Sequence, residues 1–118
     1  MQYLLLIYEA EALQDARSEA ETGAIFQAYK EFHEWLAPSG KMVGGDALHP
    51  TSTATTVRVR DGEAVLTDGP FAETKEQLGG YYLIEAENLD EATKIAAKIP
   101  SAKTGSVEVR PVMVFEGM

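Results

Sequence analysis

The chain has 118 residues, no cysteine, and 19 acidic against 10 basic side chains, which gives a formal net charge of -9. This length predicts a single domain spanning residues 1–118, because each further hydrophobic core would need about 50 residues or more. The lack of cysteine excludes disulfides, thiolate metal sites and cysteine nucleophiles. The acidic excess argues against partners that carry dense negative charge, such as nucleic acid and anionic membranes.

Residues 3–8 form the first apolar run, with apolar side chains at both odd and even positions. Such a run predicts a strand that is buried on both faces. No stretch of the chain approaches the ~20 apolar residues of a membrane span. The N-terminus also lacks the basic region and cleavage site of a signal peptide. We therefore expect a cytoplasmic protein.

A helix is predicted next, because Ser18 and Glu21 have the spacing of a capping box. The apolar residues that follow recur on one helical face: Ile25, Tyr29, Phe32 and Leu36. Pro38 and Gly40 are typical of the region just beyond a helix end, so the helix is expected to stop before them.

The middle of the chain predicts a short strand at residues 41–48 and then a hairpin. Residues 55–60 alternate with period two, Asp61 and Gly62 follow, and residues 64–67 resume a strand pattern. Asp-Gly between two such runs predicts a β-hairpin, because a type I′ turn needs positive φ at both central residues.

An irregular charged stretch leads from this hairpin to a second strand that is apolar on both faces, at residues 79–84. Asn88 and Glu91 then give another capping signal. The inner face of the helix that they open is predicted to hold Leu89, Ala92, Ile95, Ala96 and Ile99. Residues 106–115 alternate again and predict a last strand, which Pro111 places at a sheet edge.

The predicted order of elements is β-α-β-(β-β)-β-α-β, which favours an α+β fold: a ferredoxin-like sandwich with an extra β-hairpin. Two helices cover only one face of a sheet, whereas residues 3–8 and 81–84 are apolar on both faces. We expect the same sheet of a second chain to cover the other face, in a two-fold homodimer.

Residues 68–76, with the sequence DGPFAETKE, form the least generic segment. Asp-Gly-Pro makes a stiff corner, and acidic and basic groups then crowd together. If Asp68, Glu73 and Lys75 face a cleft, Asp68 and Glu73 can act as acid–base residues on a small, carbonyl-bearing substrate, and Lys75 or Arg58 can stabilise a developing oxyanion. The same spacing also fits an exposed loop of solvated charges anchored by Phe71. A third interpretation makes Phe71 a clamp inserted across the dimer interface.

Other candidate residues have equally open alternatives. His49 follows the second strand near Asp46, which allows an acid–base role, but no histidine spacing indicates a metal site. Arg58 can bind an anionic ligand or pair with surface acids. Tyr8 and Tyr81 can line a pocket for a planar ligand or belong to the core. No cofactor-binding motif is present, so no cofactor is expected. The candidate ligand contacts are therefore Tyr8, His49, Arg58, Phe71 and Tyr81.

Residues 68–84, DGPFAETKEQLGGYYLI, resemble the signature of DGPF-domain proteins in the YCII-related (YciI-like) family. Further matches at residues 3–8, 54–58 and 105–113 extend the resemblance over nearly the whole chain. The resemblance implies a dimeric α+β barrel, with a pocket between each sheet and its helices or at the dimer seam. It also implies relatives such as small-molecule monooxygenases, lactone isomerases and dehalogenase-like enzymes, and hence an unknown small-molecule ligand.

The YciI-like branch is associated with a histidine–aspartate pair whose histidine lies in the first helix. In this chain the matching position falls near Lys30, and His33 lies about one helical turn later. No catalytic histidine is therefore carried over. The resemblance also implies a link to alternative sigma factors, because DGPF-domain genes are often similar to genes that lie next to sigma-factor genes or are fused to them. This favours, as the alternative to an enzyme, a non-enzymatic regulatory or partner-binding module.

Overall fold

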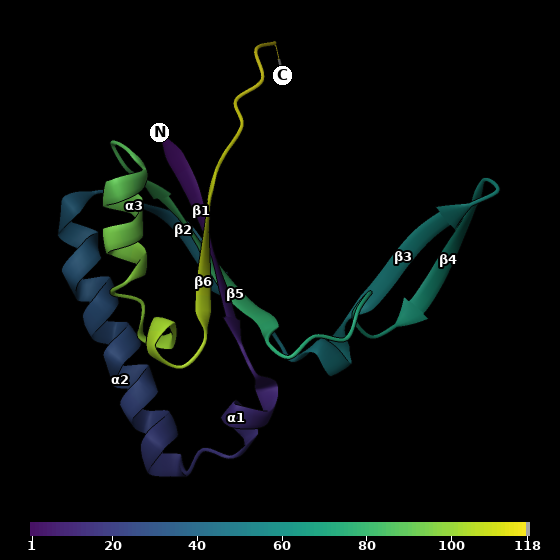
Figure 1. Ribbon diagram of the computed structural model, residues 1–118, viewed down its shortest axis with the longest axis horizontal. Helices are drawn as coiled ribbons and strands as arrows, with labels where there is room; N and C mark the ends of the chain where they lie inside the picture. The colour runs from purple at the N-terminus through teal and green to yellow at the C-terminus, as the bar shows by residue number, and fades with distance from the viewer. Residues whose placement is uncertain (118) are drawn as a thin grey trace.

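The structure is a computed structural model that describes residues 1–117. It contains a four-stranded antiparallel sheet with the order β2-β5-β1-β6, a separate hairpin and helices on one face of the sheet (Figure 1). The four strands are β1 (Gln2–Glu9), β2 (Met42–Ala47), β5 (Gln77–Glu85) and β6 (Ser106–Pro111). The chain is thus of the α+β class, as predicted.

The two central strands have one buried and one open face. On β1, Tyr3, Leu5 and Ile7 are buried beneath the helices, whereas Leu4 and Leu6 on the other face are only partly buried. The antiparallel register pairs Leu4 with Leu83 of β5, so the open face continues across both strands. We call the five apolar residues at its centre the open face: Leu4, Leu6, Tyr8, Tyr81 and Leu83.

The predicted capping residues define the starts of both long helices. At α2 (Glu19–Leu36), the Glu21 N–H donates to Ser18 Oγ (3.1 Å) and the Ser18 N–H donates to the Glu21 carboxylate (3.3 Å). At α3 (Leu89–Ala96), the Glu91 N–H donates to Asn88 Oδ1 (3.0 Å). Within residues 1–117, no helix combines the length and the apolar character needed to cross a membrane.

The core lies between these helices and the sheet. It consists of Phe32 and Leu36 on α2, Ala92, Ile95, Ala96 and Ile99 on or just after α3, Tyr3, Leu5, Ile7, Tyr82 and Ile84 on the strands, and Ala86 just after β5. The prediction that Leu89 belongs to the inner face is wrong, because its side chain is 54% exposed. Leu89 is the first residue of α3, and it is left at the solvent end of the apolar stripe.

The last strand lies at the sheet edge as predicted, but it is shorter than residues 106–115. It ends at Pro111, which pairs with Tyr3, and the Val112 N–H makes one more hydrogen bond to Gln2 O (2.9 Å). Because β1 begins at Gln2, it has no residues left to pair with those that follow Val112. The side chains of Met113, Val114 and Phe115 are accordingly exposed.

The hairpin of β3 (Thr55–Arg60) and β4 (Glu63–Asp68) has the predicted turn, with φ values of 52° at Asp61 and 77° at Gly62. It forms its own two-stranded sheet and projects away from the rest of the chain (Figure 1). The 69–76 loop returns from this hairpin to β5, turning at Gly69, whose φ is 93°. Four short elements were not predicted: α1 (Glu11–Asp15) and the 3-10 turns η1 (Ala37–Ser39), η2 (Thr51–Thr53) and η3 (Pro100–Lys103).

Candidate functional site

A cleft of about 650 Å³ lies between α1, η2 and the 69–76 loop. Its polar lining consists of Glu11, Gln14 and Asp15 on α1, Thr51 and Ser52 on η2, and Glu73, Thr74 and Gln77 at the loop and the start of β5. Three of these side chains are carboxylates, and none of the lining residues is lysine, arginine or histidine. The cleft is therefore rich in hydrogen-bond acceptors.

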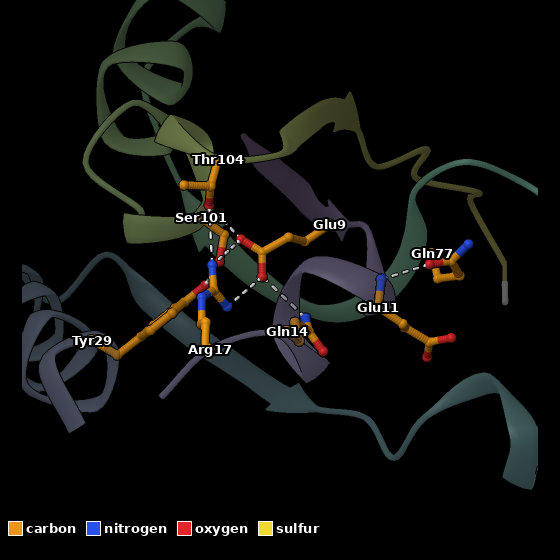
Figure 2. Close-up of polar contacts among 8 residues, drawn as sticks. All are labelled: Glu9, Glu11, Gln14, Arg17, Tyr29, Gln77, Ser101 and Thr104. Atoms are coloured by element: carbon orange, nitrogen blue, oxygen red, sulfur yellow. Dashed lines mark hydrogen bonds and ion pairs between the residues drawn. The ribbon is translucent and has the colours of Figure 1, made fainter. Parts of the chain in front are cut away.

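Glu11 ties the walls of the cleft together. Its carboxylate accepts hydrogen bonds from the Thr51 N–H (2.8 Å) and the Thr51 hydroxyl (2.6 Å). Its own N–H donates to Gln77 Oε1 (2.8 Å), as Figure 2 shows. The two hydrogen bonds from Thr51 lower the pKa of the Glu11 carboxyl, so this group is ionised at neutral pH. Through these hydrogen bonds Glu11 connects α1 with η2 and with the start of β5.

A buried ion pair fixes the chain on either side of α1 (Figure 2). The Glu9 side chain is 3% exposed, and its carboxylate accepts hydrogen bonds from Nη1 (2.8 Å) and Nη2 (2.9 Å) of Arg17. Gln14 Nε2 (3.1 Å) and the Thr104 hydroxyl also donate to this carboxylate. The bonds from Arg17 lower the pKa of Glu9 even though burial acts to raise it. The wall of the cleft that α1 provides is therefore held in place before any ligand arrives.

Glu73 differs from Glu11 in having no hydrogen-bond partner among residues 1–117. The loop that carries it is nevertheless fastened at its far end. The Thr74 hydroxyl donates to Glu76 O (2.6 Å), and the Ser106 hydroxyl donates to the Glu76 carboxylate (2.8 Å). A carboxylate that is held at a cleft but not hydrogen-bonded can accept a proton or a hydrogen bond from a ligand.

The structure separates Glu73 from the two residues with which it was grouped. Asp68 is the last residue of β4 and pairs with Thr55, and neither Asp68 nor Lys75 is among the described residues that line the cleft. Lys75 is exposed to solvent, and the Phe71 side chain is 78% exposed.

The other candidate ligand contacts lie in different places. Tyr8 and Tyr81 belong to the open face, where the Tyr81 hydroxyl donates to Asp46 Oδ2 (2.9 Å). This contact raises the pKa of Tyr81. Arg58 is exposed on the projecting hairpin, and His49 is exposed just before Pro50, which lines the cleft. The five residues predicted to contact a ligand therefore do not form a single site within this chain.

His33 takes part in a contact between helix and sheet. Its Nε2 lies 2.6 Å from the Tyr82 hydroxyl, beside the edge of the Phe32 ring. Burial raises the pKa of Tyr82 to about 12, so the hydroxyl is protonated at neutral pH and can donate to the imidazole. The pair satisfies the one polar atom of a buried tyrosine. Among the described residues, no group of three or more His, Cys, Asp or Glu side chains could hold a metal ion.

Several cleft residues were missed by the sequence interpretation, above all Glu11, Gln14 and Gln77. A five-residue helix shows no usable apolar periodicity. The available signal was acidic residues directly after the first strand, since acids are enriched in the first turn of helices. Nothing in the sequence places Glu11 beside Thr51, forty residues away.

Comparisons with known proteins agree with this architecture. The profile of the YCII-related domain matches residues 1–116. The chain belongs to the YCII-related family. An uncharacterized protein of Rhizobium meliloti (strain 1021) is 39% identical over 118 residues, covering 98% of this YCII-related chain and 95% of that relative.

A solved structure is also similar: 5-chloro-2-hydroxyhydroquinone dehydrochlorinase (TftG) from Burkholderia phenoliruptrix AC1100, in complex with 2,5-dihydroxybenzoquinone. Its TM-score is 0.50 at 15% identity, over 96% of this chain and 94% of that chain. At this identity the likeness shows a shared fold.

Proposed function

We propose that this protein binds a small polar molecule in the cleft and acts on it as an acid–base enzyme through Glu73. The observation that carries the proposal is the Glu73 carboxylate, which faces a prearranged cleft without a hydrogen-bond partner among residues 1–117. Asp68 and Lys75 stand at the two sides of Glu73 on the same segment, which carries the DGPF signature. Neither of these two side chains lines the cleft, so Glu73 is the one residue of the three to which the proposal gives direct contact with the ligand.

The lining of the cleft indicates the class of ligand. Its carboxylates, amide oxygens and hydroxyls favour a molecule that donates hydrogen bonds, such as a hydroxylated ring or an amino alcohol. The fold shared with TftG, a dehydrochlorinase of a hydroxyhydroquinone, supports a hydroxylated ring as the first choice. Hydroquinone and ethanolamine are practical probes of the two classes.

The proposal predicts that Glu73→Gln weakens binding of whichever probe occupies the cleft by at least ~10-fold, because a charge-assisted hydrogen bond is lost. Binding would be measured by NMR titration, with the side-chain amides of Gln14 and Gln77 as reporters inside the cleft. Glu34→Gln makes the same chemical change at an exposed position of α2 and should leave the affinity unchanged.

Two outcomes would contradict this proposal. One is a set of shifted amides confined to the open face, with Gln14 and Gln77 unaffected. The other is unfolding of the Glu73→Gln protein, which would show that the loop carboxylate is structural. The midpoint of thermal unfolding should stay nearly unchanged, because Glu73 is exposed.

We further propose that two copies of this chain pair through their open faces. The strand order β2-β5-β1-β6 supports a ferredoxin-like sandwich, and five partly buried apolar residues at its open face support a second sheet above it, as in a dimeric α+β barrel.

Leu83→Asp should therefore convert the dimer to monomers, because it places a charge at the centre of the paired sheets. Sedimentation velocity over a range of concentrations would measure this change. Phe26→Asp is the control, since Phe26 is 73% exposed on α2, on the opposite side of the sheet. A dimer that Phe26→Asp dissociates and Leu83→Asp leaves intact would instead pair through its helices.

A further inference from the structure

The hairpin of residues 55–68, called the arm here, has two different faces. The register pairs Val57 with Leu66 and Val59 with Ala64, so these four apolar residues share one face. Arg58 and Arg60 lie on the other face, opposite Val65 and Glu63. We call the four residues Val57, Val59, Ala64 and Leu66 the apolar arm face.

No part of the described chain covers the apolar arm face. The side chains of Val57, Val59 and Leu66 are 59%, 63% and 68% exposed. Of the residues in the two arm strands, only Thr56 is even partly buried. An isolated two-stranded hairpin is marginally stable at best in water and needs a third strand or another packing surface. The regular pairing of β3 with β4 therefore points to a surface that another molecule provides.

The overall dimensions also indicate that the single chain is not the compact unit. Its radius of gyration is 16.5 Å, whereas a compact domain of this length is expected at about 13.5 Å. The arm, which projects from the base of the sheet, contributes to this excess, as does the extended C-terminal segment (Figure 1). Six-residue strands reach about 20 Å, far enough to lie against a neighbouring molecule.

Charge argues against nucleic acid or an anionic membrane as that neighbour. The arm holds two of the ten basic and three of the 19 acidic residues, so the rest of the chain holds eight basic and sixteen acidic side chains. Arg58 and Arg60 make no ion pair within residues 1–117. With a net charge of -9 the chain would repel nucleic acid and anionic membranes, whereas the arm itself is nearly balanced, and its arginines lie on the face opposite the apolar arm face.

A second copy also supplies the missing area. A stable interface buries about 800 Å² on each partner, more than the four side chains of the apolar arm face can provide. The open face is a further apolar surface that is only partly buried in the described chain, and it supplies the rest when two copies associate. In a two-fold dimer each copy offers both surfaces, so the contacts are reciprocal.

We propose that the apolar arm face of each copy packs against the second copy of this chain, so that two arms clasp the dimer. The inference rests on the proposed homodimer and adds the element that holds the two copies together. The arm is then a dimerisation element rather than a free loop.

Two neighbouring residues of β4 provide a matched test. Leu66→Asp places a charge on the apolar arm face, whereas Val65→Asp places the same charge one residue earlier, on the opposite face. The dimer dissociation constant, measured by analytical ultracentrifugation, should rise at least ~10-fold for Leu66→Asp. For Val65→Asp it should change much less. Equal dissociation constants for the two variants would overturn the proposal.

The absence of cysteine allows an independent measurement on the otherwise unaltered chain. Val59→Cys, labelled with benzophenone maleimide and irradiated in a mixture of ¹⁴N and ¹⁵N protein, should give covalent dimers that join light and heavy chains. Val65→Cys is the matched position on the other face. Equal or absent inter-chain cross-linking at the two positions would overturn the proposal even if Leu66→Asp simply unfolded the arm.

The results also separate this inference from the dimer on which it rests. If Leu83→Asp dissociates the protein but Leu66→Asp and Val59→Cys behave as their controls, the paired open faces stand and the clasping arm is wrong. If the unaltered protein is monomeric at all concentrations, both proposals fail.

Discussion

Replacement of Arg17 by methionine should be among the most destabilising single changes in this protein. The Glu9 carboxylate is 3% exposed, and Arg17 provides two of its hydrogen bonds, at 2.8 and 2.9 Å. Arg17→Met would leave that carboxylate buried without its counter-ion. Removing one partner of a buried ion pair costs about 3–5 kcal/mol of unfolding free energy, which urea denaturation at pH 7 would measure.

The same variant has a distinctive pH dependence. In the intact protein Arg17 lowers the pKa of Glu9 below its usual 4.5, so the stability that this group contributes is complete at pH 7. That contribution is lost as the pH falls through the lowered pKa. Without Arg17, burial acts to raise the pKa of Glu9, so acid relieves the penalty in the variant. The stability difference between the two proteins should therefore shrink as the pH is lowered below 4.5.

An exposed ion pair serves as the control. Lys94 and Asp90 are 3.0 Å apart on α3, and both side chains are 76% exposed. Lys94→Met should change the stability little, because solvent screens such pairs. An Arg17→Met protein as stable as Lys94→Met, or a stability difference that does not depend on pH, would show that the Glu9 carboxylate is solvated in solution.

Local chemistry explains which parts of the fold were predictable from the sequence. The turn at Asp61 and Gly62 depends on two adjacent residues that tolerate positive φ, and the starts of α2 and α3 depend on residues three apart, such as Ser18 and Glu21. The edge position of β6 follows from Pro111, which lacks a backbone donor. These features depend on residues that are close together in the sequence, so the sequence pattern was sufficient to predict them correctly.

The cleft was not predictable because it depends on contacts between distant residues. Glu11 forms hydrogen bonds with Thr51 and Gln77, which lie 40 and 66 positions further along the chain. The end of the last strand is equally non-local, since it follows from the first residue of β1 rather than from the alternating pattern around Met113. Within the distinctive 68–76 segment, the sequence could not show that Glu73 alone among the three proposed catalytic residues lines the cleft.

Gly105→Ala should have the second large effect on stability. A Cβ atom at this position would lie 2.1 Å from the Tyr8 carbonyl oxygen and 3.1 Å from Glu9 Cα. Both are backbone atoms of β1, so a side-chain rotation cannot relieve the overlap. The start of β6 must move away from β1, and we expect a loss of about 3 kcal/mol, the upper part of the usual range for overpacking.

Gly23→Ala is the control, because it adds the same methyl group where nothing lies within 4 Å. Gly23 is inside α2, where alanine favours the helix by about 0.5–1 kcal/mol. The two glycine replacements should thus change stability in opposite directions. Hydrogen exchange gives a second measurement, since Gly105→Ala should expose the amides that pair β6 with Tyr8. A Gly105→Ala protein that keeps both its stability and these protected amides would mean that the two strands are not so closely packed.

Gly105 and Arg17 are also expected to be coupled. Thr104, the neighbour of Gly105, donates its hydroxyl to the same Glu9 carboxylate that Arg17 binds. When Gly105→Ala displaces this segment, part of the Glu9 network is already lost, so adding Arg17→Met should cost less than it does alone. A double-mutant cycle in urea should show a departure from additivity of at least about 0.5 kcal/mol. Strict additivity would mean that the movement at Gly105 does not reach Thr104, and that the ion pair and the strand contact stabilise the fold separately.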